Sequence, residues 1–384
     1  MNLFQQDNLL LIKKNKLSGF YDTIVDGIWE YSPPKTMTVL EWDNQTDVFQ
    51  FNRQIENIIE RDNISALICL AYYYIQPKLL LKIQEKVWRI KVDGDDEEFF
   101  DHFTRWYGGL FDVNVTTSNY VKIKLEELDY RSLVIPTFLK STPVTNKPID
   151  CLNTVAFVGL LKGKFNRTEY INHLKQSGVP ITHYGLDSES GYLDEHEKNS
   201  VFETAAISLN FTGVSCDFIG ANDFPDLKRK KQMKGRPFEV IRSGGFLMTE
   251  ESEDLNYFLK ENVHYVSFSN KNELLEKIQH YLTHRDQRDE IAERGKKYFE
   301  ENLSYQKAFP QFLKELSIIR AQKSLLESVE MSKHAKFFLL QWVRPGQLIQ
   351  ILTLDRGKLG FPIKLTELLE YLFIRIVSKL RCSR

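Results

Sequence analysis

Residues 234–255, KGRPFEVIRSGGFLMTEESEDL, combine cations, a glutamate in an apolar run, a Gly-Gly pair and a group of acids. Arg236 and Pro237 suit the first turn of a short helix, and Gly244 or Gly245 suits its left-handed C-terminal cap. The apolar residues that follow predict a strand, and the acids after them predict a turn. The stretch therefore predicts a helix-to-strand unit of an α/β sheet.

Glu239 is the residue of this stretch that the proline and glycine signals do not explain, since it lies between Phe238 and Val240. A buried carboxylate is costly unless it accepts hydrogen bonds. Two vicinal ribose hydroxyls would supply such bonds, which would make Glu239 part of a nucleotide site. Its spacing by itself favours the alternative, a solvent-exposed helix residue.

Short apolar runs alternate with helical periodicity over most of the chain, as expected for mostly parallel sheets covered by helices. The alternation runs from Thr38 to about Val134, stops in the proline-bearing segment 139–153, and resumes at residue 154. Turn formers without periodicity are typical of a linker. We therefore predict an α/β fold with two doubly wound domains, residues 1–150 and 151–316, and a helical, apolar and basic tail, residues 317–384.

The composition limits the classes of function. A formal net charge of −1 gives no global attraction to nucleic acid, so any electrostatic function must be local. The N-terminal segment lacks the apolar core of a signal peptide, and no run of about eighteen apolar residues predicts a membrane span. The cysteines are isolated and lack zinc spacing, which favours a reducing cytoplasm as the location: Cys69, Cys151, Cys216 and Cys382.

A loop without clear periodicity, residues 214–236, precedes Glu239 and ends in cations. These cations fit a solvated basic face, a patch that follows nucleic-acid phosphates, or a site for a compact diphosphate. No aromatic residues are interleaved with them to stack on bases, which disfavours nucleic acid. Cations leading into a helix N-terminus suit a diphosphate better. They are Lys228, Arg229, Lys230, Lys231, Lys234 and Arg236.

A second candidate for anion binding is residues 157–170, FVGLLKGKFNRTEY, where a strand leads through Gly159 and Lys164 to a helix that starts at Arg167. This loop is neither a Walker loop nor a dinucleotide fingerprint, so ATP hydrolysis and NAD chemistry lose their usual support. An ordinary surface loop has the same composition, and both interpretations stay open.

Three aspartates, Asp93, Asp95 and Asp96, follow a predicted strand of the first domain. Carboxylates at this spacing are compatible with a magnesium site. The alternative is a turn followed by a helix N-cap and an acidic first turn, and the sequence favours it.

Taken together, these residues resemble the group-1-like glycosyltransferases of the CgeB type, whose GT-B fold has two facing Rossmann-like domains. The likeness extends from about residue 38 to residue 315 and is most specific in residues 234–282. Supporting segments are RWYGGLFDVNVTTS, VAFVGLLKGKFNRTEYINHL and ISLNF.

The resemblance implies transfer of a sugar from a nucleoside diphosphate sugar to a hydroxyl of a glycan, a lipid-linked molecule or a protein, in polysaccharide biosynthesis. The second domain would bind the donor and the first the acceptor. No metal or other cofactor is implied, because protein cations stabilise the leaving diphosphate. Glu250 would lie near the sugar, and Asp95 is the candidate base. The implied donor-binding residues are Lys234, Arg236, Glu239, Gly244, Gly245 and Glu251, with Gly159, Lys164 and Arg167 from the second candidate loop.

One departure from the family pattern is Lys231, because the wider superfamily has a glutamate eight residues before the ribose-binding glutamate. The contact to the transferred sugar and the stereochemical outcome therefore stay open. An inactive protein of the same fold that binds sugar nucleotides or glycans is the alternative. A nucleic-acid-associated protein is the least favoured reading, given the near-neutral charge.

The tail combines an apolar helical face with cations. Residues 331–384 contain ten bases and three acids, a net charge of about +7. One interpretation is a helix that packs on the first domain or on a second copy of the chain. The other is a helix on an anionic lipid surface, which would place the protein at the inner face of the membrane. The apolar residues are Leu365, Leu368, Leu369, Leu372, Phe373, Ile376, Val377 and Leu380.

Overall fold

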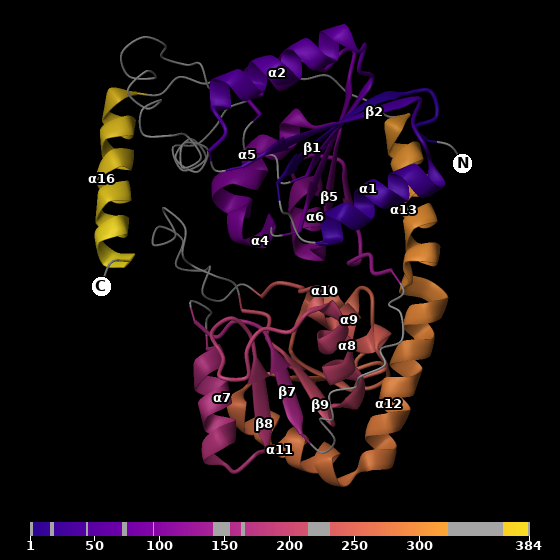
Figure 1. Ribbon diagram of the computed structural model, residues 1–384, viewed down its shortest axis with the longest axis vertical. Helices are drawn as coiled ribbons and strands as arrows, with labels where there is room; N and C mark the ends of the chain where they lie inside the picture. The colour runs from indigo at the N-terminus through magenta and orange to yellow at the C-terminus, as the bar shows by residue number, and fades with distance from the viewer. Residues whose placement is uncertain are drawn as a thin grey trace. The chain divides into compact units, whose positions relative to one another are not determined.

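The computed structural model of the chain describes residues 3–15, 19–43, 45–70, 75–94, 96–140, 154–162, 166–213, 231–321 and 364–382. The described residues form two compact units (Figure 1). The first contains the chain up to Ile135 and the part from Pro310 onward, and the second lies between Pro136 and Phe309. The predicted boundary near residue 150 falls in residues 141–153, which are outside the described part of the chain.

The first unit is built on a six-stranded parallel sheet in the order β2-β1-β3-β4-β5-β6. β3 is buried along its whole length, as a central strand covered on both faces must be. β1 also lies inside the sheet, although the alternation in the sequence begins only at Thr38. Its apolar run, Leu9–Ile12, is too short to show a period. The strands are β1 (Asn8–Lys14), β2 (Thr36–Trp42), β3 (Ala66–Leu70), β4 (Trp88–Asp93), β5 (Val113–Thr116) and β6 (Ser132–Val134).

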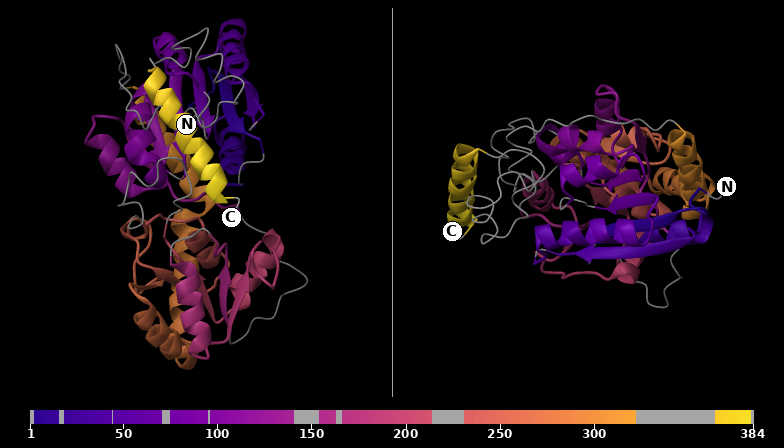
Figure 2. Two further views of the ribbon diagram at one scale, coloured as in Figure 1. Left: turned by 90° about the vertical axis from the view of Figure 1, so that its left-hand side faces the viewer. Right: turned by 90° about the horizontal axis from the view of Figure 1, so that it is seen from above.

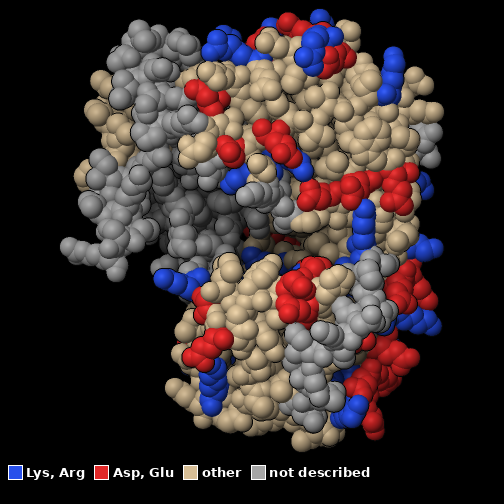
Figure 3. All heavy atoms as spheres, in the orientation of Figure 1, with Lys and Arg blue, Asp and Glu red and all other residues tan. Residues whose placement is uncertain are grey.

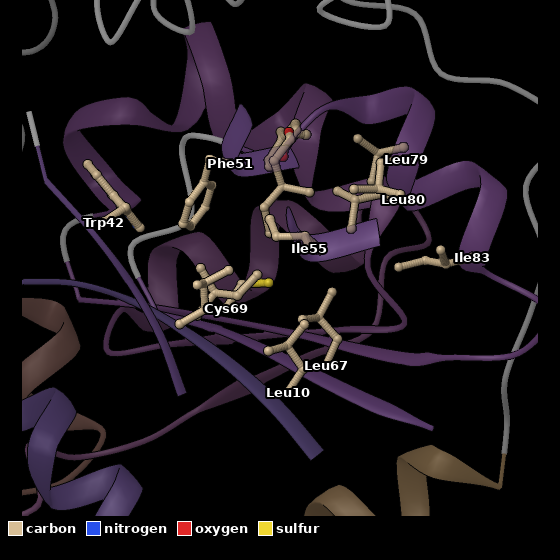
Figure 4. Packing of buried hydrophobic residues seen from close by; sticks show 14 of the residues in the cluster. Leu10, Trp42, Phe51, Ile55, Leu67, Cys69, Leu79, Leu80 and Ile83 are labelled. Atoms are coloured by element: carbon tan, nitrogen blue, oxygen red, sulfur yellow. The ribbon is translucent and has the colours of Figure 1, made fainter. Parts of the chain in front are cut away.

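Helices cover both faces of this sheet, because right-handed crossovers and the reversal of direction after β2 place α1 opposite α2 and α3. Phe51 and Ile55 of α2 and Leu80 of α3 pack on Leu67 and Cys69 of β3 in one buried cluster (Figure 4). The helices between the strands are α1 (Gly19–Tyr31), α2 (Val48–Arg61), α3 (Pro77–Ile83), α4 (Asp96–Phe99), α5 (Arg105–Tyr107) and α6 (Asn119–Glu126).

The second unit contains a five-stranded parallel sheet in the order β11-β10-β9-β7-β8. The alternation of short apolar runs with helical periodicity that resumes at residue 154 predicted such a sheet covered by helices. The two parallel sheets confirm the predicted class of two Rossmann-like α/β domains. The strands are β7 (Val155–Val158), β8 (Ile181–Tyr184), β9 (Ile207–Asn210), β10 (Leu247–Glu250) and β11 (Val266–Phe268). The helices are α7 (Arg167–Gln176), α8 (Glu195–Thr204), α9 (Arg236–Arg242), α10 (Glu253–Asn256), α11 (Lys271–Thr283) and α12 (Arg285–Tyr298).

The C-terminal part of the chain returns to the first unit. α13 (Tyr305–Arg320) ends with Arg320, whose guanidinium donates to both carboxylate oxygens of Asp7 at 2.6 and 2.7 Å. Figure 2 shows α16 (Leu365–Cys382) as a continuous helix from two further directions. Its Leu368 and Tyr371 belong to the buried cluster of the first unit. Among the described helices, none is long and apolar enough to cross a membrane.

A buried ion pair, Arg89 with Asp112, joins β4 to the loop before β5. Arg89 donates to Asp112 from its backbone N at 2.7 Å, from Nε at 3.1 Å and from Nη2 at 3.0 Å. Its Nη1 donates to the carbonyl oxygen of Leu80 at 2.9 Å. Both side chains are at most 2% exposed, so each charge depends on the other for compensation.

We expect Asp112→Ala to destabilise the first unit by about 3–5 kcal/mol, because it leaves the Arg89 charge buried without a partner. Four of the five tryptophans, Trp29, Trp42, Trp88 and Trp106, are described residues of the first unit, and none lies in residues 136–309, so tryptophan fluorescence during urea unfolding does not report on the second unit. Lys122→Ala, which removes an ion pair with Glu126 on the surface of α6, is the matched control and is expected to change stability by less than about 1 kcal/mol. Equal unfolding midpoints for the two variants would contradict the prediction.

Candidate functional site

The candidate site lies at the carboxyl ends of β7, β9 and β10 in the second unit. The strand order changes direction between β8 and β9, so the switch point of the sheet lies between β7 and β9. Ligands of open α/β sheets bind at such a point. Arg167 is the first residue of α7, Arg236 is the first residue of α9, and Glu250 ends β10.

Arg167 is a buried cation that is only partly satisfied by the protein. It is 7% exposed, and Nη1 donates to the carbonyl oxygen of Leu160 at 2.9 Å. Among the described residues no acid forms an ion pair with it, and its Nε has no hydrogen-bond partner. Burial and then the nearby Arg236 lower the pKa of Arg167 to about 10, against the opposing effects of Glu250 and Asp187. A bound anion would supply the missing compensation.

Glu239 is half-buried in the structure, contrary to the expectation from its spacing that it would be exposed. Its Oε1 accepts a hydrogen bond from Lys198 Nζ of α8 at 2.8 Å. Its Oε2 lies 3.4 Å from Arg236 Nε as an ion pair but accepts no hydrogen bond. Arg236 Nη1 is likewise buried without an acceptor. The neighbouring helix α8 thus shields Glu239 from solvent, and both Glu239 and Arg236 keep hydrogen-bonding capacity for a ligand.

Glu250 and Glu251 differ in how firmly they are held. Glu250 Oε2 accepts hydrogen bonds from the backbone N of Thr212 at 3.0 Å and from its Oγ1 at 2.9 Å. Glu251 is exposed, and its Oε2 lies 3.8 Å from Lys231 Nζ. Lys231, eight residues before Glu239, therefore lies at the same edge as Glu251. Lys234 is half-buried in the segment that leads into α9.

Backbone N–H groups of the loop after β7 donate hydrogen bonds within the protein. Gly159 N donates to the carbonyl oxygen of Tyr184 at 2.8 Å. The backbone N–H groups of Leu161 and Lys162 both donate to Asp187 Oδ2, at 2.8 and 2.7 Å. A carboxylate thus occupies these described N–H groups of the predicted anion-binding loop, while Lys164 lies outside the described residues.

Gly244 and Gly245 have structural roles at the opposite edge of the sheet. Gly244 adopts a φ of 81° directly after α9, which confirms the predicted left-handed cap. A Cβ at Gly245 would lie 2.2 Å from the carbonyl oxygen of Phe202 in α8, so only glycine fits there. Both glycines precede β10 and lie at the amino ends of the strands. This placement removes the reason for expecting them to approach a donor.

The acids of the first unit are only partly described, because Asp95 lies outside the described residues. Asp96 begins α4 and is fully buried, and its Oδ1 accepts hydrogen bonds from Lys91 Nζ at 2.7 Å and Thr104 Oγ1 at 3.1 Å. This buried ion pair favours the structural interpretation of Asp96 over a magnesium ligand. The role of Asp95 as a base stays a prediction.

Three residues near the site were missed by the sequence reading: Lys198, Thr212 and Asp187. Lys198 lies in a helix of mixed charge, where nothing in the spacing distinguishes it from its neighbours. Thr212 and Asp187 follow strands. Polar residues shortly after strands are often part of ligand sites, and this signal could have identified both of them from the sequence.

Comparison with known proteins agrees with this geometry. Residues 167–314 match the family described as glycosyl transferase-like. No curated protein matches the chain in sequence. The family match covers less than half of the chain and gives it a glycosyl transferase-like domain, most of which lies in the second unit.

Solved structures of glycosyltransferases share the fold. Anabaena Alr3699/HepE, crystallised in complex with UDP and glucose, is 11% identical with a TM-score of 0.59, over 82% of this chain and 100% of that chain. A glycosyltransferase from Rickettsia africae ESF-5 is 11% identical with a TM-score of 0.57, over 83% of this chain and 99% of that chain. Sucrose-phosphate synthase (tll1590) from Thermosynechococcus elongatus is 9% identical with a TM-score of 0.55, over 83% of this chain and 100% of that chain. The fold is therefore GT-B, and the CgeB-type subfamily stays a prediction.

We expect Arg167→Met to leave the stability of the ligand-free protein unchanged or higher, since it removes a buried charge that forms no ion pair among the described residues. Pyrophosphate at 100 times its dissociation constant is expected to stabilise the wild type by about 2.7 kcal/mol and the variant by much less. Scanning calorimetry with and without pyrophosphate measures both effects. The control is Lys162→Met, an exposed cation of the same loop, which should respond as the wild type does. A full response to pyrophosphate in Arg167→Met would refute the assignment.

Proposed function

We propose that the protein is a glycosyltransferase that moves a sugar from a nucleoside diphosphate sugar to an acceptor hydroxyl. The observation that carries the proposal is the pair of guanidiniums, Arg167 and Arg236, each with a buried nitrogen that lacks an acceptor. They are close enough for Arg236 to lower the pKa of Arg167. Two neighbouring cations that repel one another suit a diphosphate, which compensates both at once.

The same arrangement accounts for the chemistry of the transfer. Negative charge grows on the leaving diphosphate as the glycosidic bond breaks, so Arg167 and Arg236 stabilise the transition state more than the ground state. Glu239 Oε2 accepts hydrogen bonds from the ribose hydroxyls. Lys234 and Glu251 lie beside the bound nucleotide sugar. Glu250, held by Thr212, faces the sugar. The two arginines take the role that a metal has in other transferases, and no cofactor is required.

The donor and acceptor follow from chemistry and from relatives in the fold. Alr3699/HepE has been crystallised with UDP-glucose, which supports a uridine diphosphate hexose as the first donor to test. The acceptor hydroxyl belongs to a glycan, a lipid-linked sugar or a protein, and Asp95 of the first unit is the proposed base that removes its proton. Such a reaction serves polysaccharide biosynthesis in the cytoplasm.

A second candidate function is binding of sugar nucleotides or glycans without catalysis. The observation in its favour is Lys231, a cation beside Glu251 at the position of the superfamily glutamate. Nucleic-acid binding has less support, because acidic and basic groups are interspersed on the described surface in Figure 3. Turnover of a donor that binds would separate the catalytic from the binding function.

We expect Glu239→Ala to weaken binding of nucleoside diphosphates by about 10- to 100-fold without unfolding the protein, because hydrogen bonds to a charged group contribute about 1.5–3 kcal/mol. Calorimetry with UDP, GDP, ADP and UDP-glucose measures the affinities. Glu253→Ala, an exposed acid of α10, is the control and should bind as the wild type does. An unchanged affinity of Glu239→Ala for every nucleotide that binds the wild type would remove Glu239 from the site.

We also propose that α16 contacts an anionic membrane surface. Leu368 and Tyr371 are buried in the first unit, which agrees with packing on that domain. An adjoining face carries Leu365, Leu369 and Phe373, which are 50, 55 and 68% exposed at a spacing of four residues. The tail has a net charge of about +7, which leaves about −8 for residues 1–330. An apolar stripe on a basic segment suits anionic lipid.

We expect the double variant Leu369→Glu, Phe373→Glu to lose binding to vesicles of anionic lipid, because it places charge in the apolar stripe. The wild type should co-sediment with anionic vesicles in a salt-sensitive way and not with neutral ones, since each basic residue near the surface adds about 1 kcal/mol. Ile123→Glu, at a similarly exposed apolar position of α6, is the control and should bind like the wild type. The membrane proposal fails if the wild type stays in solution or if the double variant still binds.

A further inference from the structure

The two helices α8 and α9 pack through polar side chains at the candidate site. Arg242 Nη2 donates to Asn199 Oδ1 at 2.8 Å and to Glu195 Oε1 at 3.3 Å. Lys198 Nζ donates to Glu239 Oε1 at 2.8 Å. The interface therefore depends on directional contacts, which hold one helix in register with the other.

This interface is not fully satisfied by the protein. Four of its side-chain atoms are buried and have no hydrogen-bond partner: Asn199 Nδ2, Arg236 Nη1, Glu239 Oε2 and Arg242 Nε. Buried polar atoms in folded proteins nearly always have partners, so such a group of exceptions requires an explanation. Glu239 Oε2 and Arg236 Nη1 are the members that belong to the proposed donor site.

Lys198 forms a hydrogen bond with one oxygen of Glu239 and thereby leaves the other oxygen available to a ligand. Its ammonium engages Oε1, and Oε2 keeps its lone pairs. The backbone of Lys198 is itself fixed, because a capping box between Asp194 and Glu197 holds the first turn of α8. On its other side Lys198 Nζ lies 2.7 Å from Glu195 Oε2. Burial raises the pKa of Glu195, but hydrogen bonds from Lys198 and Arg242 outweigh it and lower the pKa, so Glu195 is a carboxylate at neutral pH.

We propose that Lys198 is a positioning residue for ribose recognition: it holds Glu239 so that Oε2 accepts the vicinal hydroxyls of the donor ribose. This inference rests on the proposed donor site and adds to it a residue from a different helix. Without Lys198, Arg236 is the remaining ion-pair partner of Glu239 among the described residues, and the carboxylate is free to rotate towards it. The expected loss is therefore selective for the ribose hydroxyls, while the diphosphate contacts of Arg167 are unaffected.

The experiment compares UDP with 2′,3′-dideoxy-UDP, which has the same base and diphosphate but lacks both hydroxyls. Calorimetry on the full chain gives the two dissociation constants, with GDP and ADP and their dideoxy forms in parallel. The wild type is expected to prefer the ribonucleotide by about tenfold or more, since hydrogen bonds to a charged group are involved. Lys198→Met is expected to lower this preference to less than about threefold, with the affinity for the dideoxy form unchanged.

Two further variants separate positioning from a general effect on the fold. Lys198→Arg keeps a cation that reaches Glu239 and is expected to restore part of the preference. Lys271→Met removes an exposed ion pair with Glu169 elsewhere in the second unit and should behave as the wild type. Thermal unfolding of each variant shows whether the second unit is intact.

Each outcome bears on a different claim. A Lys198→Met variant that keeps the full preference, or that loses equal affinity for both forms, overturns the positioning role. A wild type that binds UDP and its dideoxy form equally overturns ribose recognition by Glu239, and with it the role of Lys198. A wild type that binds none of the nucleoside diphosphates overturns the proposed function itself.

Discussion

The parallel pairing of β9 with β7 on one side and β10 on the other is the constraint on which the candidate site depends. Right-handed crossovers and the reversal of direction between β8 and β9 leave the carboxyl ends of β7 and β9 as the open point of the sheet. α7 and α9 both begin at this edge. Arg167 and Arg236 are therefore neighbours in space, although they are distant in the sequence.

The Arg89–Asp112 ion pair and the candidate site differ in how their buried charges are satisfied. In the first unit, Arg89 donates four hydrogen bonds, three of them to Asp112. In the second unit, Arg167, Arg236 and Glu239 each keep a buried atom without a hydrogen bond. Removing an ion from water costs several kcal/mol, more than the roughly 1 kcal/mol of a typical hydrogen bond. The first arrangement stabilises the fold. The second leaves a free-energy cost of burial that a bound anion would offset.

Part of the site is already filled by the protein's own carboxylates. Asp187 occupies the backbone N–H groups of Leu161 and Lys162, so these groups order the loop after β7. Oε1 of Glu239 is used by Lys198, and Oε2 of Glu250 is used by Thr212. Fewer polar groups therefore remain for a sugar donor than the composition of the loops suggests. Their orientations are fixed before binding, which lowers the entropic cost of binding.

Local signals were sufficient to predict the strands from β2 to β11 and most of the helices that cover them, including α9 and the left-handed Gly244 that ends it. Periodicity and turn residues act within a few positions, so they can be read without knowing the neighbours. β1 was missed because its apolar run is too short to show a period. Only the tertiary structure decided that Glu239 is half-buried against Lys198 and that Gly245 packs on α8 at the opposite edge. The physical reason is that periodicity reports which face of an element is apolar, whereas the partner of a charged side chain depends on which elements the sheet makes neighbours.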